Sequence, residues 1–341
     1  MREPYLVVSD LKVSFPTADG VVTAVQGLSY SVPLGRTLAI VGESGSGKSV
    51  SSLALMGLHD PKRTAISGSI QIGGDEIVGM SQRKLRRHRG ASTAMIFQDP
   101  LSSLHPFFTI GDQIGEAYRA HSGARKRAAR KRAAEMLARV GIPNPAARLD
   151  DYPHQFSGGM RQRVMIAMAL VNDPKLLIAD EPTTALDVTV QAQILDLIAD
   201  LQQEFGSAVV FITHDLGVVA EIADDVLVMY AGRAVEYGST EQILARPLHP
   251  YAWGLLESIP ALSGEPAPLH PIPGLPPSLL DMPPGCSFSP RCEFRDRVPD
   301  DLCRRELPLL AARTAEDARL SRCHLPDPDV RFHLEILPRL P

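Results

Sequence analysis

The sequence has no long apolar run and little net charge. The 341-residue chain contains no continuous apolar stretch long enough to cross a bilayer as a helix, which takes about 18 residues or more. The formal net charge is only −4, so overall electrostatics give no reason to expect a nucleic-acid partner. Residues 1–10 lack an apolar signal core with a small-residue cleavage site. We therefore expect a cytoplasmic protein that reaches any membrane by docking onto another protein.

Cysteine is missing from residues 1–285, and all four cysteines come later. Proline, by contrast, is concentrated after Pro247, in a stretch that cannot form a regular helix or a central strand. The composition therefore predicts two parts. A compact domain covers residues 1–245, and a Pro-rich extension with the four cysteines covers residues 246–341.

Residues 42–49 are the stretch around which the compact domain is organised. They read Gly-Glu-Ser-Gly-Ser-Gly-Lys-Ser, between an apolar run at 37–41 and a helix-compatible run at 50–58. Strand, glycine-rich loop and helix form the context of a P-loop, whose N–H groups surround phosphate oxygens. We predict that Lys48 reaches the β- and γ-phosphates and that Ser49 binds Mg²⁺. The predicted nucleotide-binding residues of this loop are Gly42, Ser44, Gly45, Gly47, Lys48 and Ser49.

Polar side chains follow three further apolar strands. Gln98 follows residues 92–97, Asp180 and Glu181 follow residues 175–179, and His214 follows residues 208–213. The carboxyl ends of parallel strands are where α/β sheets bind ligands. We predict that Asp180 holds Mg²⁺, directly or through water, and that Glu181 polarises the attacking water. A contact of His214 with the γ-phosphate is also expected.

A helix start with two glycines stands at Ser157-Gly158-Gly159. Ser157 can act as an N-cap, and such a helix start leaves several N–H groups open to an anion. Two glycines are costly for capping alone, so this turn predicts an approaching ligand or backbone.

Residues 110–172 are predicted to be helical, and residues 124–140 carry seven basic side chains. They allow a nucleic-acid interpretation, but apolar residues at helical spacing favour an ordinary solvated helix face.

Together these motifs resemble the nucleotide-binding subunit of an ATP-binding cassette (ABC) transporter, over about residues 5–240. In the terms of that family, residues 42–49 match Walker A, Leu176 to Asp180 match Walker B, and Ala185-Leu186-Asp187 match the D-loop. Gln98 matches the Q-loop and is implied to contact Mg²⁺. Ser157-Gly158-Gly159 match the signature, Glu181 the catalytic carboxylate and His214 the switch histidine. Met160 departs from the family's usual Gln, with little expected effect.

The resemblance implies an α/β fold of the P-loop NTPase class. Its parts are a mixed core sheet, an antiparallel β subdomain, and a helical subdomain at about residues 100–172. A small irregular C-terminal domain follows. Spacing alone favours Phe15 as a core residue, whereas the resemblance assigns it to stacking on adenine. It also implies that two such domains close head to tail on two ATP molecules, so one chain must pair to be active.

Three stretches are similar to the oligopeptide/dipeptide importer branch, namely residues 97–106, 181–191 and 249–253. The Pro-rich exit that ends at Gly285-Cys286 is similar too, while His105 stands where that branch usually has Asn. This resemblance implies a second, related ATPase, two transmembrane permeases and an extracytoplasmic solute-binding protein. It places the chain peripherally at the cytoplasmic face of the membrane, without nucleic acid. Nickel importers share this branch, which leaves the solute open.

The cysteines are spaced C-x5-C-x10-C-x19-C, at Cys286, Cys292, Cys303 and Cys323. Disulfides are not expected in a reducing cytoplasm, and structural zinc prefers closer cysteine pairs. Chemistry alone leaves zinc and an iron–sulfur cluster open. Members of the importer branch with this pattern carry a four-iron four-sulfur cluster, and the resemblance therefore favours the cluster.

Two other classes use some of the same motifs. Soluble ABC proteins of DNA repair carry long coiled-coil insertions, and those of translation carry two cassettes, whereas this chain has neither. A P-loop kinase or GTPase is disfavoured by the Ser-Gly-Gly helix start and by the histidine at a strand end.

Overall fold

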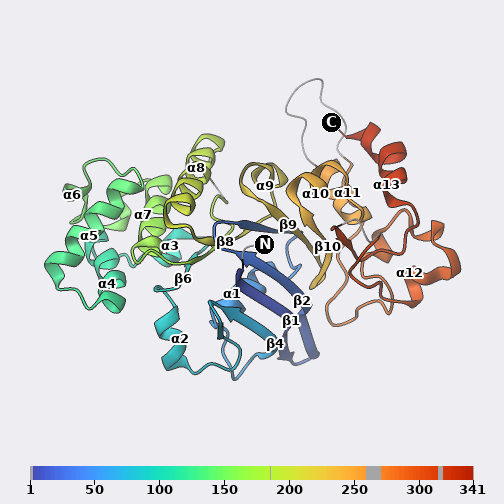
Figure 1. Ribbon diagram of the computed structural model, residues 1–341, viewed down its shortest axis with the longest axis horizontal. Coiled ribbons are helices and arrows are strands. Elements are labelled where there is room, and N and C mark those ends of the chain that lie inside the picture. Colours follow the sequence, from blue (N-terminus) through green and yellow to red (C-terminus); the bar gives the residue numbers. More distant parts are fainter. Residues whose placement is uncertain (1–2, 185, 259–269, 314–317, 341) are drawn as a thin grey trace.

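The computed structural model describes residues 3–184, 186–258, 270–313 and 318–340. At its centre is an eight-stranded sheet with the order β11-β12-β10-β9-β3-β8-β7-β6 (Figure 1). The strands from β9 to β6 are parallel, whereas β10, β12 and β11 are antiparallel to their neighbours. The bounds are β3 Thr37–Val41, β6 Thr93–Ile96, β7 Leu176–Asp180, β8 Ala208–Thr213, β9 Asp225–Tyr230, β10 Arg233–Ser239, β11 Ala311–Ala312 and β12 Leu320–Ser321.

The central strands are apolar on both faces. Every residue of β3, β7 and β8 is buried, as expected for parallel strands that are covered on two sides. Because these strands are parallel, the polar residues that follow their carboxyl ends lie at the same edge of the sheet.

A second, four-stranded antiparallel sheet lies beside the first, with the order β2-β1-β4-β5. It contains β1 (Pro4–Thr17), β2 (Gly20–Pro33), β4 (Ala65–Ile72) and β5 (Asp75–Glu76). Its inward residues, such as Leu11 and Leu28, form one core with Ile40 of β3 and Ile178 of β7. This sheet is the predicted antiparallel subdomain.

The helices α3 to α7 lie together at the far end of the molecule from the C-terminal extension (Figure 1). Their core includes Met136, Leu137, Val164 and Ile166, which agrees with the predicted helical subdomain. The bounds are α3 Pro100–Ser103, α4 Ile110–Ser122, α5 Lys126–Arg139, α6 Pro145–Arg148 and α7 Gly158–Leu170.

Further helices flank the central sheet. α8 begins after Asp187, whose carboxylate accepts from the Val190 N–H at 3.0 Å, and ends before the left-handed Gly206, a typical helix stop. The bounds are α1 Lys48–Leu55, α2 Gln82–His88, α8 Val188–Phe205, α9 Leu216–Ile222 and α10 Thr240–Ala245. Among the described residues, no helix is both long and apolar enough to cross a membrane.

The C-terminal extension packs against the central sheet. Trp253, Phe294 and Phe332 form a core with Val41 and Tyr230 of that sheet, and β12 pairs with β10. Its helices are α11 Pro250–Glu257, α12 Leu302–Arg305 and α13 Pro328–Arg331, and its short turns are Ser289–Arg291, Arg295–Arg297, Pro299–Asp301, Phe332–Ile336 and Leu337–Arg339. The α/β cassette fold with a C-terminal addition is thus confirmed, while the boundary at residue 245 stays a prediction.

Candidate functional site

The P-loop joins β3 to α1 and needs glycine at both of its ends. A Cβ at Gly42 would lie 2.2 Å from the carbonyl oxygen of Met229, and one at Gly47 would lie 2.3 Å from that of Ala24. Gly47 also has a left-handed backbone, with φ of 99°. The loop is therefore pressed against the neighbouring backbone, which fixes its course toward the start of α1.

Lys48 is the first residue of α1, and its side chain is buried. Its Nζ donates to the carbonyl oxygens of Gly42 at 2.6 Å and Glu43 at 3.0 Å. Burial lowers the pKa of Lys48, while Glu181, Asp180 and Glu43 oppose that shift. The ammonium group thus lies inside the loop that is predicted to hold phosphate.

Asp180, at the end of β7, faces the start of α1. Its carboxylate accepts from Ser49 Oγ at 3.1 Å and from Ser52 Oγ at 3.3 Å. Burial raises the pKa of Asp180, and the two serine hydrogen bonds oppose this. A carboxylate next to a hydroxyl is an oxygen donor set that suits Mg²⁺. The residues predicted to hold the ion are therefore adjacent.

Glu181 is the point where the other strand ends meet. Gln98 Nε2 donates to its Oε2 at 3.0 Å, as does Thr184 Oγ1 at 3.0 Å, and His214 Nδ1 lies 3.5 Å from its Oε1. Glu181 itself has a left-handed backbone, with φ of 47°. Such a conformation is rare outside glycine and ends the extended backbone of β7. Three residues predicted separately to be catalytic thus form one cluster.

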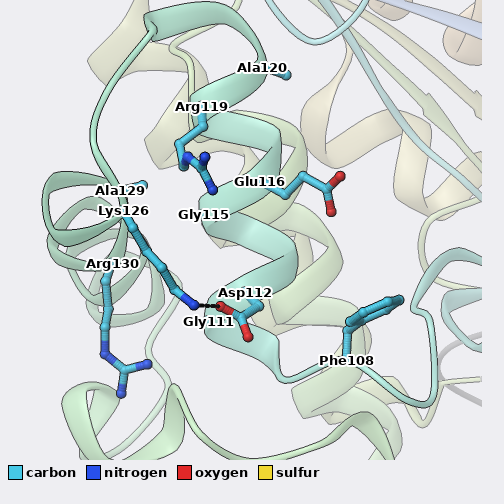
Figure 2. A pocket seen from close by; sticks show the side chains of 10 residues that line it. All are labelled: Phe108, Gly111, Asp112, Gly115, Glu116, Arg119, Ala120, Lys126, Ala129 and Arg130. Atoms are coloured by element: carbon cyan, nitrogen blue, oxygen red, sulfur yellow. Dashed lines mark ion pairs between the residues drawn. The ribbon is translucent and has the colours of Figure 1, made fainter.

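A cavity of about 490 Å³ lies elsewhere, on the surface between α4 and α5, where Figure 2 shows an ion pair between Asp112 and Lys126. Other basic residues of α5 are paired as well, including Arg130 with Asp150 and Arg132 with Asp173. Their charge is balanced by neighbours on the same subdomain, which supports the interpretation as a solvated helix face.

The P-loop itself borders a cavity of about 780 Å³. Its lining brings together Gly42, Glu43, Ser44, Gly45, Ser46, Gly47, Lys48, Ser49, Gln98, Glu181 and His214, with Ala24, Val50, Leu255 and Leu279. Two of these residues, Leu255 and Leu279, belong to the C-terminal extension and were not predicted. Phe15 is not among the described lining residues; its ring meets His59 edge-on, at 5.6 Å between centroids. Its stacking on adenine stays a prediction.

The signature turn is not part of this cavity's lining. Ser157 caps α7 as predicted, because its Oγ accepts from the Met160 N–H at 3.3 Å. Ser157 and Gly158 are exposed, and a Cβ at Gly158 would meet nothing within 4 Å. A Cβ at Gly159 would instead lie 2.8 Å from Val190 of α8. The start of the signature turn, Ser157-Gly158, is therefore exposed at the surface of the molecule. Of the D-loop, Ala185 lies outside the described residues.

The four cysteines are free thiols in the extension. Burial raises the pKa of Cys303 to about 11 and that of Cys323 to about 12, and the neighbouring cysteines add to both shifts. The pKa values of Cys286 and Cys292 are also raised by burial. The thiols thus lie near one another. Within the described part of the chain, however, no group of three or more His, Cys, Asp or Glu residues is arranged to hold a metal ion. The structure does not support the predicted cluster.

Several residues that shape the site were missed from sequence. Thr184 holds Glu181, Ser52 holds Asp180, and Gln162 of α7 donates to the carbonyl of Pro182, next to Glu181. Ser52 follows Ser49 at helical spacing, so it could have been found. Gln162 could not, because its contact joins residues that only the tertiary fold brings together.

Comparison with known proteins assigns both parts of the chain. Residues 25–184 match the family model of the ABC transporter, and residues 235–298 match that of the oligopeptide/dipeptide transporter, C-terminal region. The oligopeptide transport ATP-binding protein OppD of Haemophilus influenzae is 54% identical, over 85% of this chain and 90% of that protein. The dipeptide transport ATP-binding protein DppD of Bacillus subtilis is 52% identical, over 87% of this chain and 89% of that one.

Solved structures agree with this assignment. A bacterial ABC transporter cassette, solved as a dimer, matches with a TM-score of 0.62 and 26% identity, over 69% of this chain and 98% of that one. The cbiO1 protein of Clostridium perfringens, part of an ABC transporter complex, matches with a TM-score of 0.60 and 30% identity, over 72% of this chain and 92% of that one. The chain therefore belongs to the ABC transporter family, as one of the ATP-binding proteins of its oligopeptide/dipeptide transporter group.

Proposed function

We propose that this chain hydrolyses ATP in the P-loop cavity to power the import of di- and oligopeptides. The observation that carries the proposal is the cluster at Glu181, whose carboxylate lies next to Gln98, Thr184 and His214. Glu181, Gln98 and His214 all line the P-loop cavity. The peptide substrate is taken from the relatives, which are named for oligopeptide and dipeptide transport.

Phosphate binding falls to the P-loop. Lys48 exchanges the carbonyls of Gly42 and Glu43 for the β- and γ-phosphate oxygens, which are stronger acceptors because they are charged. The N–H groups at the start of α1 add the positive end of a helix dipole. Ser49 and Asp180, with Gln98, would hold Mg²⁺, which neutralises charge on the phosphates when it is bound.

Hydrolysis falls to Glu181. Its carboxylate accepts a proton from the attacking water, and the hydrogen bonds from Gln98 and Thr184 fix its orientation. His214, which lies beside it, stabilises the γ-phosphate as the bond to the leaving oxygen breaks. The proposed mechanism is therefore tested by substituting Glu181.

The Glu181→Gln variant should bind ATP as the unchanged protein does and lose about a thousandfold in turnover, because Gln cannot accept the proton. Turnover is measured as phosphate release, and binding by filter retention of labelled ATP. Normal hydrolysis by this variant would show that the base is another residue.

Assembly follows from the outward position of the signature turn. Ser157, Gly158 and Gly159 would close on the ATP of a second, related ATPase, and that subunit's signature would close on the ATP held here. A solved relative is a dimer bound to ADP and phosphate. The pair would dock on two permeases at the cytoplasmic face of the membrane and receive solute from an extracytoplasmic binding protein.

The substrate class is tested by reconstituting this chain with its permeases and second ATPase in vesicles. ATP-dependent uptake of di- and oligopeptides is expected. Uptake of Ni²⁺ without peptide uptake would instead make the chain a nickel importer.

We also propose that Cys286, Cys292, Cys303 and Cys323 bind a four-iron four-sulfur cluster with a structural role. Four cysteines gathered in one segment, two of them buried and two partly buried, support this proposal, since thiolates are the ligands of such clusters. Anaerobically purified protein should be brown and contain iron and sulfide in the ratio of the cluster. Colourless protein with stoichiometric zinc, or with no metal, would overturn it.

A further inference from the structure

Arg291, in the turn between Cys286 and Cys292, reaches the P-loop from 248 positions away in the sequence. Its guanidinium forms two parallel hydrogen bonds with the carboxylate of Glu43, Nη1 to Oε2 at 2.8 Å and Nη2 to Oε1 at 3.1 Å. The Arg291 side chain is only 6% exposed. A paired, forked contact of this kind fixes direction as well as distance.

The remaining donors of Arg291 are also used. Nε donates to the carbonyl of Pro273 at 2.8 Å, while Nη2 and Nη1 donate to the carbonyl of Ile272 and to Tyr230 Oη, each at 3.4 Å. All five N–H groups thus have acceptors, as a buried guanidinium requires. Glu43 is therefore bound by a guanidinium group that is itself fixed by three further hydrogen bonds.

The backbone of Glu43 is held by the same extension. Its N–H donates to Tyr251 Oη of α11 at 2.8 Å, and its carbonyl accepts from Lys48 Nζ at 3.0 Å. The Glu43 carbonyl also accepts from the Ser46 N–H at 3.2 Å. The side chain and the N–H of Glu43 are thus both held by the extension, close to the phosphate-binding lysine. Leu255 and Leu279 of the extension line the cavity nearby.

We propose that Arg291 is a positioning residue for ATP. Through Glu43 it holds the first half of the P-loop in the conformation that receives phosphate, so the cysteine-bearing turn becomes a support of the nucleotide site. Arg291 touches no reacting group, and its effect is on ATP affinity and KM, while kcat at saturating ATP is preserved. This inference rests on the proposed ATP site at the P-loop.

The test is the Kd of MgATP for the full chain, measured by calorimetry for Arg291→Gln, Arg291→Lys, Glu43→Gln and the double variant Glu43→Gln/Arg291→Gln. Each Gln substitution should weaken binding about tenfold. The double variant should bind no more weakly than either single variant, because both report the same contact. In the assembled transporter, Arg291→Gln should raise KM for ATP and leave kcat within about twofold.

The matched control is Arg319→Gln. Arg319 is a buried arginine of the same extension and pairs with Asp329 at 3.2 Å; its loss should lower the melting temperature and leave the Kd within about twofold. If Arg291→Gln does not fold, Arg291→Lys decides, because it keeps the charge and loses the fork. An unchanged Kd in the Arg291 variants, or an equal effect of Arg319→Gln, overturns the proposal. Failure of the unchanged chain to bind ATP, or equal binding by Lys48→Met, overturns the ATP site itself.

Discussion

The P-loop and the signature turn, which we propose both to bind ATP, are built differently. The P-loop is held at its ends, by the packing of Gly42 and Gly47 and by the contacts of Glu43 with Tyr251 and Arg291, while Ser44 and Gly45 between them are exposed. In the signature turn Ser157 and Gly158 are exposed, Ser157 caps α7, and Gly159 packs against Val190 of α8. We therefore expect the P-loop to bind phosphate as it stands, and the signature turn to meet nucleotide only on a second subunit. On this proposal the P-loop is one half of an ATP site, and the signature turn is the complementary half for the ATP of a second subunit.

The largest effect on ATPase activity is expected from a substitution in the signature turn. Ser157→Arg places a bulky side chain where a partner's nucleotide must approach, and should lower ATPase activity of the assembled pair by about a thousandfold. The isolated chain should still bind ATP with the Kd of the unchanged protein, because its own P-loop is intact. Both are measured on one preparation, by phosphate release and calorimetry.

Thr109→Arg is the control for the loss of a helix cap, since Thr109 caps α4 through the Asp112 N–H. It should leave ATPase activity nearly unchanged. Weaker ATP binding by the isolated Ser157→Arg chain would mean that the turn belongs to the same chain's site, and the comparison would fail.

The second prediction concerns Lys48, the lysine of the P-loop. Lys48→Met keeps most of the side-chain volume and removes the ammonium group, so the Kd for ATP should rise about a hundredfold. Nucleotide binding is followed by displacement of a fluorescent ATP analogue. A variant that binds ATP normally would overturn the proposed ATP site at this loop.

The extension that supports the loop should be sensitive to acid through His249. This residue caps α11, where its Nδ1 accepts from the Tyr251 N–H at 3.0 Å, and burial lowers its pKa to about 3. Below about pH 6.5 the unfolded chain takes up a proton that the folded His249 cannot, so stability falls as the pH falls. The loss due to this residue should reach about 2 kcal/mol at pH 5.

Urea unfolding at pH 7.5 and pH 5 measures this loss. His249→Asn keeps a capping acceptor and does not titrate, so its stability should change less between the two pH values. An equal change in both proteins would assign the acid sensitivity to other groups.

The smallest effect is expected at Met160, the position of the signature turn where the resemblance led us to expect Gln. Its N–H serves the cap of Ser157, whereas its side chain packs, partly buried, on the helical core. Met160→Gln should therefore change ATPase activity by less than about twofold. A large change would show that this side chain also takes part in closure on the partner's ATP.

Sequence patterns predicted the local elements closely. The apolar runs at 37–41 and 208–213 coincide with β3 and β8, because the hydrophobic pattern of a strand is set over a few residues. The extension was predicted less well. Its proline content suggested an irregular tail, whereas its aromatic residues share a core with Val41 and Tyr230, and β12 joins the sheet. No periodic pattern in the sequence of the extension predicts such long-range packing.

The sequence by itself determined which chemical groups stand at the phosphate-binding loop and at the strand ends, since a P-loop needs only eight consecutive residues with the right flanks. It also determined that the signature lies on the same chain. Only the tertiary structure decided that Glu181 gathers Gln98, Thr184 and His214, and that Arg291 supports Glu43. These contacts join side chains far apart in the sequence, and their geometry follows from how the layers pack rather than from any local preference.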